Sequence, residues 1–531
     1  MAKLFEKVLA AIPILFAAVI IIPSTTIMTG CKEPAGPDTV RVVDTIRDVD
    51  TITNVDTVTN VDTVTNVDTV TIRDTNYIDG MKIIRDSDID SGETLTLSAD
   101  TVYLLNGFVF VENNATIVIP AGTVIKAKPG GGLNASALII CRGGKILATG
   151  TAAKPIIFTA QQDNLAEVDD LPQASRGLWG GLILLGKSTV NTASGTAQIE
   201  GITADDPRGA YGGTVADDSS GVLQYISIRY GGSNIGEGNE INGLTMGGVG
   251  SKTVIDHIEV YCNNDDGFEW FGGTVNCKYL ISAGNADDSF DWDEGFRGKG
   301  QFWLAIQDKW TADRAMEGDG NPSNNMGSAG FSKPTLYNLT LIGSGASSKN
   351  NGNMAMKLRE ETGMLLHNSI ITGFPGDLKV SGGAVVSTGV INIDNEKGNA
   401  GYRVSDHMLT TGDLVISNNL FFGFGYGMDS AKIMKYSDAA TPTMTAADKA
   451  AMDSLVVNFN TFSADPKLTV TRGEEYITAF DPIPAAGSPA LTWTGTAEPA
   501  DGFFTDVSYC GAFTTGDTWH TWAFCMEAFN Q

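Results

Sequence analysis

The chain has 531 residues and a formal net charge of −27, with 62 acidic against 35 basic side chains. A surface of this charge repels nucleic acid, so the composition argues against DNA or RNA as a partner. No Walker loop, dinucleotide-binding glycine motif, HExxH or CxxC occurs, so no nucleotide or common cofactor is expected. The 62 glycines and the 18% charged residues instead suit short strands joined by tight turns.

Residues 1–30 have the pattern of a bacterial export signal. Two lysines precede an apolar run over residues 8–22, which is short for a membrane span, and small residues then lead to Cys31. The stretch IMTGC resembles a lipobox, which predicts that Cys31 is lipidated and anchors the chain to the lipid bilayer. The alternative is a cleaved signal that leaves Cys31 free or disulfide-bonded. The KEP that follows resembles a signal for the cell surface, which predicts a surface-exposed outer-membrane lipoprotein of a Gram-negative bacterium.

Residues 31–78 contain five tandem hexads that begin at Val43: VDTIRD, VDTITN, VDTVTN, VDTVTN and VDTVTI. Five hexads make fewer than two coils of three faces, which is too few to bury a core. The repeat therefore predicts an extended stalk, with a reach on the order of 150 Å at about 3.3 Å per residue. A self-associating fibrous stalk is the alternative.

Residues 79–531 have the pattern of an all-β domain. Short stretches rich in Thr, Val and Ile, such as ATIVIPAGTVIKA and ALIICRGGKILATG, alternate with Gly, Asn and Asp. One inserted helix is expected over residues 445–457, with Thr445 as its N-cap. A C-terminal cap is expected at about residues 500–531.

A four-residue motif recurs in the middle of this domain: polar, small, large apolar, polar. Its copies are Asn242-Gly243-Leu244-Thr245, Asp266-Gly267-Phe268-Glu269, Asp288-Ser289-Phe290-Asp291, Arg314-Ala315-Met316-Glu317 and Met354-Ala355-Met356-Lys357. Successive copies start 24, 22, 26 and 40 residues apart. A spacing that drifts while the motif persists is typical of a parallel solenoid, whose strands stack in register while loops absorb insertions. We therefore predict an inward column of the apolar residues and an outward column of Thr245, Glu269, Asp291, Glu317 and Lys357.

The outward column predicts a ladder of carboxylates. Stacked strands lie about 4.8 Å apart, and two unit charges at about 5 Å repel by roughly 1 kcal/mol in water and roughly 3 kcal/mol at an effective dielectric of 20. Oxygen ligands at this density suit Ca²⁺. The candidate metal ligands are Asp265, Asp266, Glu269, Asp287, Asp288, Asp291 and Glu317. Two alternatives stay open: the acids serve as ordinary turn residues, or they form a catalytic site with Arg314 or Lys357 as the base.

Aromatic and cysteine residues add two further predictions. Trp270 and Trp292 follow the motif closely, and they either fill the core or offer flat surfaces on which sugar rings stack. An exported protein can form disulfides, and Cys510 and Cys525 are the expected pair. The sequence does not determine whether three other cysteines form disulfides: Cys141, Cys262 and Cys277.

Longer phrases resemble a known family. The stretch from SIRYGG to NCKYL (residues 227–280), together with WGGLILLGKS and DPIPAAGSPAL, resembles bacterial secreted proteins and lipoproteins with a pectate-lyase-like fold. The resemblance covers roughly residues 85–531 and implies a right-handed parallel β-helix. It implies no activity, because the family has none established, and the Gly-His-Gly of polygalacturonases does not occur here.

These observations predict a non-enzymatic lipoprotein of the cell surface. Its β-helix presents an acidic face, stabilised by Ca²⁺, for adhesion or for binding a polysaccharide or a surface protein. Two other functions stay open. One is a calcium-dependent polysaccharide lyase or hydrolase, which needs a basic residue beside the ladder. The other is a structural component of a surface layer or matrix.

Overall fold

The structure, a computed structural model, describes residues 76–531 apart from 237–238, 323–324, 349, 351, 382–383, 397–402, 439–442, 463 and 475. The predicted export signal and all but the last three residues of the predicted stalk lie outside the described residues. The chain divides into Met1–Arg73 and Asp74–Gln531, and every described residue belongs to the second unit. Its first strand, β1 (Tyr77–Ile78), pairs antiparallel with the next strand, so the folded domain begins before the predicted boundary at residue 79.

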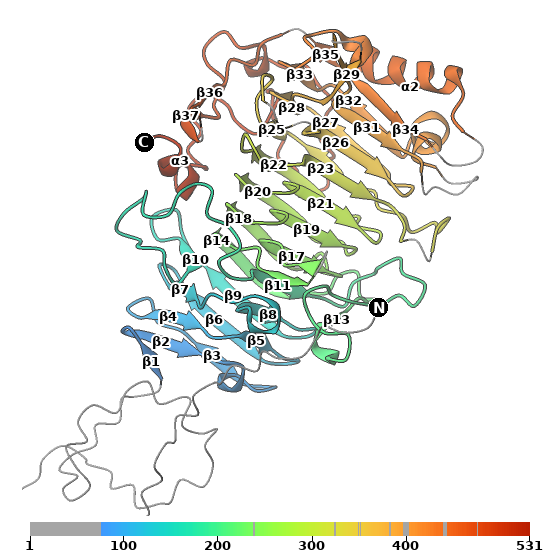
Figure 1. Ribbon diagram of the computed structural model, residues 1–531. Coiled ribbons are helices and arrows are strands. Elements are labelled where there is room, and N and C mark those ends of the chain that lie inside the picture. The colour runs from blue at the N-terminus through green and yellow to red at the C-terminus, as the bar shows by residue number, and fades with distance from the viewer. Residues whose placement is uncertain are drawn as a thin grey trace, which may run out of the picture. The chain divides into compact units, whose positions relative to one another are not determined.

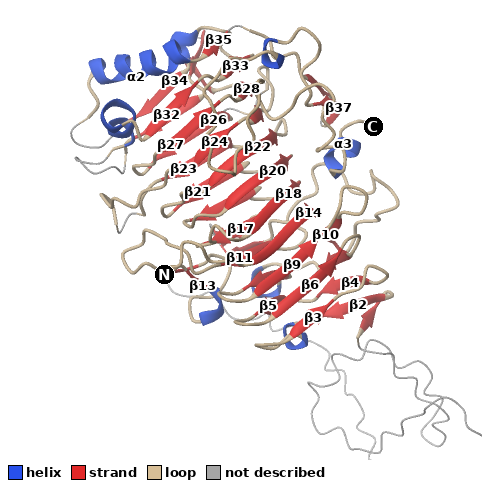
Figure 2. Cartoon of the chain, turned by 180° about the vertical axis from the view of Figure 1, so that it is seen from behind, coloured by secondary structure: helices blue, strands red, loops and turns tan. Residues whose placement is uncertain are grey.

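Three faces of parallel strands build this unit, and equivalent strands of successive coils lie side by side (Figures 1 and 2). The first face consists of β5 (Phe108–Val111), β8 (Ala137–Ile140), β11 (Leu182–Leu185), β17 (Leu244–Gly247), β19 (Phe268–Phe271), β21 (Phe290–Asp293), β23 (Arg314–Asp319), β26 (Met354–Arg359), β31 (Ile391–Asp394) and β34 (Met434–Ser437). The predicted all-β fold, a parallel β-helix, is confirmed.

The second and third faces belong to one larger sheet. The second face consists of β3 (Thr94–Thr96), β6 (Thr116–Pro120), β9 (Lys145–Thr149), β14 (Gly221–Arg229), β18 (Val254–Tyr261), β20 (Asn276–Ala283), β22 (Lys299–Ile306), β24 (Thr335–Tyr337), β27 (Met364–His367) and β32 (Leu414–Ser417). The third consists of β2 (Met81–Ile84), β4 (Val102–Leu105), β7 (Val124–Ala127), β10 (Ile156–Ala160), the second halves of β14, β18, β20 and β22, and then β25 (Thr340–Ile342), β28 (Ile370–Thr372), β33 (Leu420–Phe422) and β35 (Thr461–Phe462).

Smaller elements decorate the coils. Antiparallel pairs are β12 (Ala197–Gln198) with β13 (Ala210–Tyr211), β15 (Asn234–Gly236) with β16 (Asn239–Glu240), β29 (Asp377–Ser381) with β30 (Ala384–Thr388), and β36 (Thr469–Arg472) with β37 (Ile477–Asp481). The α-helices among the described residues are α1 (Val404–Asp406), α2 (Ala446–Phe459) and α3 (Phe524–Ala528). Among the described residues, no helix is both long and apolar enough to cross a membrane.

Four long strands bend from the second face to the third at a single residue with positive φ. The bend residues are Tyr225 (52°), His257 (55°), Tyr279 (56°) and Phe302 (60°). The first half of β14 pairs with β9 and its second half pairs with β10, so the bend lies between two strands of the preceding coil. In later coils the equivalent residues are Asn338, Asn368 and Asn418.

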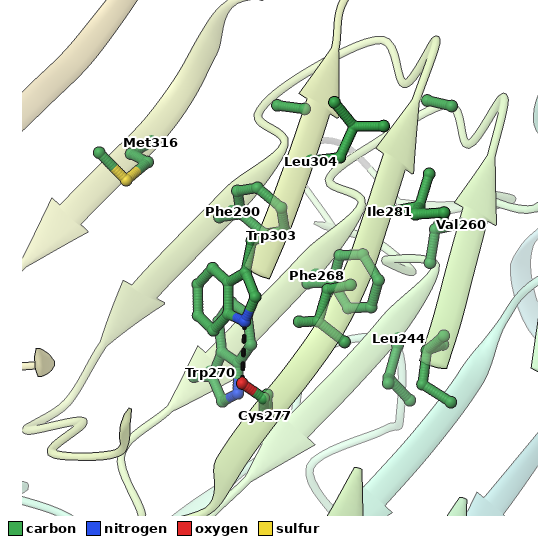
Figure 3. Packing of buried hydrophobic residues seen from close by; sticks show 14 of the residues in the cluster. Leu244, Val260, Phe268, Trp270, Cys277, Ile281, Phe290, Trp303, Leu304 and Met316 are labelled. Carbon is green, nitrogen blue, oxygen red and sulfur yellow. Dashed lines mark hydrogen bonds between the residues drawn. The ribbon is translucent and has the colours of Figure 1, made fainter. Parts of the chain in front are cut away.

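The inward column has the predicted register. Leu244, Phe268, Phe290, Met316 and Met356 lie side by side in β17, β19, β21, β23 and β26, and all five are fully buried. Figure 3 shows four of them in the core, beside the stacked rings of Trp270 and Trp303. Because side chains alternate along a strand, the residue after each of the five faces outward.

The small residue of the motif has a steric cause. A Cβ atom on Gly267 would lie 2.6 Å from the hydroxyl of Ser282 and 2.8 Å from the carbonyl oxygen of Ser289. Contacts this short leave no room for a larger side chain at the start of β19. In this copy of the motif, glycine is therefore required by the close approach of the neighbouring coil.

The inserted helix begins as predicted. The Thr445 hydroxyl accepts the backbone N–H of Asp448 at 3.1 Å, and the Asp448 carboxylate accepts the N–H of Thr445 at 2.8 Å. This reciprocal cap fixes the first turn of α2. The helix ends at Phe459, two residues later than predicted, and buries Met452 and Val456 against the core.

Residues 493–531, here called the C-terminal strap, run back along the outside of the β-helix. The Trp493 indole donates to the carbonyl of Asn418, next to β32, and further along the strap α3 lies beside β18 (Figure 1). The prediction of a terminal cap at about residues 500–531 is therefore wrong. The segment covers a side of the coils instead of closing their end.

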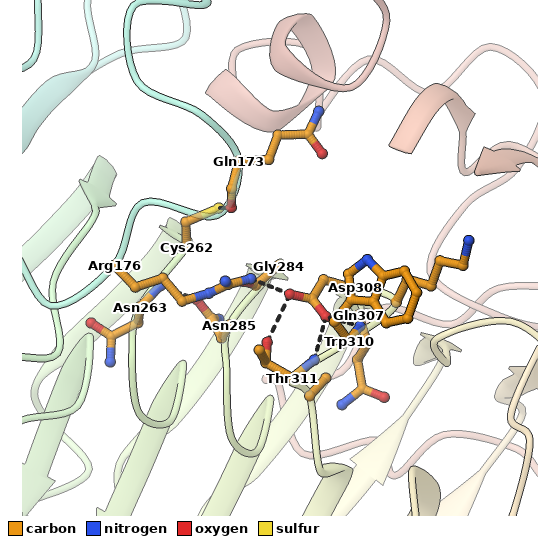
Figure 4. Close-up of polar contacts among 12 residues, drawn as sticks. Gln173, Arg176, Cys262, Asn263, Gly284, Asn285, Gln307, Asp308, Trp310 and Thr311 are labelled. Carbon is orange, nitrogen blue, oxygen red and sulfur yellow. Dashed lines mark hydrogen bonds and ion pairs between the residues drawn. The ribbon is translucent and has the colours of Figure 1, made fainter. Parts of the chain in front are cut away.

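The course of the strap also separates the two cysteines predicted to pair. Cys510 packs with Ile370 and Leu420, whereas Cys525 belongs to the main core cluster, and both thiols are free. The predicted disulfide between Cys510 and Cys525 is therefore not formed in the structure. Cys141, Cys262 and Cys277 are also free and buried. In Figure 4 the Cys262 thiol lies against the carbonyl of Gln173, to which it donates at 2.9 Å.

Glu259 in β18 anchors the end of the strap. Its fully buried carboxylate accepts the backbone N–H groups of Cys525 at 2.7 Å and of Phe524 at 3.0 Å, and the hydroxyl of Ser227 at 2.5 Å. The guanidinium of Arg229 lies 3.9 Å from the centre of the Phe524 ring. This buried carboxylate, with two of its three donors at the start of α3, holds the helix on the coils.

Replacing this anchor is expected to loosen the strap. Glu259→Gln should lower the free energy of unfolding by about 1–3 kcal/mol, because the amide nitrogen cannot accept a backbone N–H and leaves a buried donor without a partner. Urea unfolding and the rate of proteolysis within the strap measure the effect. The control is Glu527→Gln, an exposed side chain on α3. Equal behaviour of the two variants would contradict the anchoring role.

Candidate functional site

The outward side chains of the first face form the predicted ladder. Thr245 in β17 pairs in register with Glu269 in β19, then with Asp291 in β21, Glu317 in β23 and Lys357 in β26. All five positions are those predicted from the motif. Like charges thus occupy three successive coils, and a lysine follows them.

A groove of about 420 Å³ runs along this ladder and is here called the acidic groove. Its lining consists of Glu200, Asn242, Asp265, Asp266, Glu269, Asp287, Asp288, Asp291, Asp313, Glu317, Lys357 and Arg359. All seven predicted metal ligands are among these residues. Nine carboxylates thus face two basic side chains.

The sequence prediction missed two carboxylates of the groove. Asp313 directly precedes a copy of the motif, as Asp265 and Asp287 do, so an alignment extended by one residue would have found it. Glu200 comes from the long loop between β11 and β14 and belongs to no repeated pattern. Only the folding of that loop onto the first face brings Glu200 to the groove.

The outward column is no longer acidic beyond the two ends of the groove. Toward the N-terminus it continues as Ile183, Ile139 and Phe110, which the loop carrying β12 and β13 covers in a separate hydrophobic cluster. Toward the C-terminus, Lys357 and Arg359 contact a carboxylate oxygen of Glu317 at 3.2 Å and 2.7 Å. The carboxylates between these ends have no such neutralising partner on their own column.

Two of the candidate ligands also have a structural role. Asp266 accepts the backbone N–H of Asp288 at 2.9 Å, and Asp288 accepts the N–H of Arg314 at 2.5 Å. Each carboxylate thereby ties the start of its strand to the start of the next. These hydrogen bonds join neighbouring coils and are not the local backbone contacts of a turn residue, and both carboxylates also line the groove.

Three groups of carboxylates are close enough to share a cation. One oxygen from each member lies within 4.8 Å of the others in Asp265–Asp266–Asp287, in Asp266–Glu269–Asp291 and in Asp287–Asp288–Asp313. Asp291 Oδ1 and Asn242 Oδ1 are buried acceptors without a hydrogen-bond partner in the described part of the chain. A buried acceptor left in this way costs about 1–3 kcal/mol. A hard divalent cation with oxygen ligands would satisfy such atoms.

The electrostatics of the groove oppose the ionised state. Burial raises the pKa of Asp266, Glu269, Asp288 and Asp291 well above the usual range, and neighbouring carboxylates raise the pKa of each further. Burial beside Glu294 raises the pKa of Asp293, at the end of β21, to about 7. Protons or cations must compensate charge here at neutral pH.

The two candidate bases are both engaged. Arg314 pairs with Asp313 and donates to the carbonyl of Gly352 at 2.8 Å. Lys357 contacts Glu317. Neither side chain stands alone beside the ladder as a lyase base would.

The tryptophans predicted to stack on a ligand lie in the core. Trp270 and Trp292 are fully buried, and the Trp292 indole donates to the hydroxyl of Thr362 at 3.0 Å. The prediction is wrong because alternation along the strand places each ring on the inward side, opposite its neighbour in the ladder. The other interpretation of these rings, core packing, is the one that the structure shows.

The fold and the groove define a class: a parallel β-helix with a carboxylate-rich outer face. Residues 88–418 match the pectate-lyase-like beta helix domain, which is more than half of the chain, so the protein belongs to that family. No curated protein and no solved structure matches the chain.

The raised pKa values predict a pH dependence. A carboxyl group with a higher pKa in the folded than in the unfolded chain stabilises the fold at low pH and loses that contribution as pH rises through the folded pKa. In chelator, the melting temperature of the wild type should therefore fall, relative to that of Glu269→Gln/Asp291→Asn, as the pH rises from about 4, the unfolded pKa, to neutral pH, because burial raises the pKa of both carboxyl groups in the folded chain. Comparing the two proteins removes contributions from other groups. A difference that stays constant across this range would contradict the prediction.

Proposed function

We propose that the acidic groove binds Ca²⁺ and that the bound cation holds an anionic glycan at the cell surface. The observation that carries this proposal is the buried Asp291 Oδ1, which lacks a partner within a set of carboxylates whose oxygens lie within 4.8 Å of one another. A cation removes the repulsion in the ladder and satisfies this oxygen. Its remaining coordination positions then face the groove, where a uronate carboxylate can complete the shell.

Binding fits the groove better than catalysis. A lyase needs a base that is free to take a proton from the sugar. Lys357 and Arg359 instead lie against Glu317, and Arg359 also binds Asp319 at 2.5 Å. Both ion pairs hold a basic side chain at the C-terminal end of the groove, which suits recognition of a carboxylate there.

The sequence supports a location for this activity. We propose that Cys31 is acylated and that the hexads beyond it hold the β-helix away from the outer membrane. Single lipid chains give weak, reversible binding, whereas several chains on one residue anchor a protein stably. A surface adhesin needs this arrangement, because its groove must reach a polymer outside the cell.

Calcium is expected to bind the full chain and to stabilise it. We expect a dissociation constant of about 10⁻⁴–10⁻³ M, as in extracellular modules, and a gain of about 2.7 kcal/mol at a calcium concentration one hundred times that constant. Calorimetric titration and melting in calcium or chelator measure both. Glu269→Gln/Asp291→Asn should lose the binding, whereas Glu167→Gln/Asp169→Asn, which removes two exposed charges elsewhere, should keep it.

Experiments with the same proteins distinguish glycan binding from glycan cleavage. Retardation of the wild type in gels that contain polygalacturonate or alginate, only with calcium, supports the proposal. Release of unsaturated uronate products would show the lyase activity instead. If the protein binds calcium but neither polymer retards it, calcium only stabilises the fold, and the glycan proposal is wrong.

Lipidation is expected at Cys31 alone. In a bacterial host that processes lipoproteins, Cys31→Ala should abolish incorporation of labelled fatty acid and move the protein from the membrane fraction to the soluble fraction. Cys141→Ala serves as the control, because that thiol is buried in the β-helix. Membrane retention of both variants would contradict acylation as the anchor.

A further inference from the structure

A second groove lies over the bend between the second and third faces. There the rings of Tyr225, His257, Tyr279 and Phe302 stack on four successive coils, with centroids 4.2, 4.3 and 5.2 Å apart. All four residues have positive φ, which is uncommon for bulky side chains. Unusual backbone geometry of this kind is concentrated at functional sites. The later coils place asparagine at the same bend, and asparagine adopts this conformation readily.

The C-terminal strap seals the asparagine part of the bend. Asn338 and Asn368 donate to the carbonyls of Tyr509 and Thr496 at 3.1 Å and 2.7 Å. Asn418 donates to the Thr496 hydroxyl at 2.7 Å. In these coils the strap lies directly on the bend, and side-chain hydrogen bonds hold it there.

Over the aromatic part the strap leaves a groove of about 420 Å³, here called the aromatic groove. Its lining consists of Ala152, Tyr225, Tyr279, Phe302, Thr505, Val507, Tyr509, Gly516, Asp517, Thr518 and Trp519. The rings of Tyr279 and Trp519, one from the coils and one from the strap, lie 5.2 Å apart at a tilt of 55°. Two segments far apart in sequence thus build one ring-lined surface.

The lining combines flat rings with free hydrogen-bonding groups. Tyr225, Tyr279, Tyr509 and Trp519 are only half-buried. None of the three tyrosine hydroxyls has a hydrogen-bond partner in the part of the chain that the structure describes. A sugar ring presents C–H groups on its faces and hydroxyls at its rim. The rings and hydroxyls of this groove match both features.

The charges around the aromatic groove disfavour an anionic sugar as its ligand. Asp517 lines the groove, Asp256 lies beside His257, and the chain carries a net charge of −27. The nearby ammonium of Lys278 is already bound to the carbonyl of Phe503 at 2.6 Å and to the Thr505 hydroxyl at 2.8 Å. An anionic sugar would find no free cation here, so the groove suits an uncharged one.

We propose that the aromatic groove binds the rings of a neutral glycan without a metal ion. This site lies on a different side of the β-helix from the acidic groove and differs from it in chemistry, so it goes beyond the function proposed above. A chain with both grooves can hold a neutral and an anionic polymer independently.

The test titrates the full chain, in chelator, with four hexasaccharides: β-1,4-linked glucose, β-1,3-linked glucose, β-1,4-linked mannose and β-1,4-linked xylose. Tryptophan fluorescence and calorimetry should detect saturable binding of at least one. Trp519→Ala should weaken that binding at least tenfold. Trp310→Ala is the matched control, since this indole is 50% exposed and lies on another loop.

A second variant guards against a loss of structure. Trp519 also stacks on Phe513 at 4.7 Å, so its removal loosens the strap as well as the groove. The triple variant Tyr225→Phe/Tyr279→Phe/Tyr509→Phe keeps every ring and removes only the three hydroxyls, and it should also weaken binding at least tenfold.

Four outcomes would overturn the proposal. The first is that no hexasaccharide binds, and the second is that both groove variants bind like the wild type. The third is that Trp310→Ala loses as much affinity as Trp519→Ala. The last is binding that needs calcium and disappears in Glu269→Gln/Asp291→Asn, which would place the sugar in the acidic groove.

Discussion

Parallel pairing of equivalent strands in successive coils is the constraint on which the other features depend. Hydrogen bonds hold neighbouring strands about 4.8 Å apart, so a side chain at one position always lies beside its counterpart in the next coil. Three columns illustrate this: the apolar column through Phe268 and Phe290 inside, the carboxylates through Glu269 and Asp291 outside, and the rings at the bend. A side chain of one chemical type in a single coil therefore lies beside side chains of the same type in the neighbouring coils.

The same constraint creates the main electrostatic cost. Neighbouring carboxylates in the ladder repel by roughly 1–3 kcal/mol per pair, which is a noticeable share of a typical folding free energy of about 5–15 kcal/mol. The chain limits this cost at the two ends of the ladder, with apolar residues under a loop on one side and Lys357 with Arg359 on the other. The middle coils have no such residues in the ladder, and it is there that Asp291 has an oxygen without a partner in the described part of the chain.

The parts of the structure that follow a period were predictable, and those that depend on distant contacts were not. The register of the ladder and the cap at Thr445 were recognisable in the sequence because both depend on residues at fixed local spacing. The same alternation, applied to Trp270, would have placed that ring inside. The arrival of Glu200 at the acidic groove and the return of the strap depend on how long, non-repeating segments pack, for which the sequence carries no periodic signal. The aromatic bend was missed because one left-handed residue in each strand interrupts the alternation.

The two grooves differ in what a column of like side chains implies. Stacked rings attract one another by about 0.5–1.5 kcal/mol per pair, so the column through Tyr279 stabilises itself and is no evidence for a ligand. Stacked carboxylates repel, so the ladder through Asp291 needs compensation from outside the column. The acidic groove therefore points to a cation through its own energetics. The aromatic groove points to a ligand through the tyrosine hydroxyls that line it, which have no hydrogen-bond partner in the described part of the chain. Because the two grooves rely on different chemistry, a substitution in one groove should abolish binding there and leave binding in the other groove unchanged.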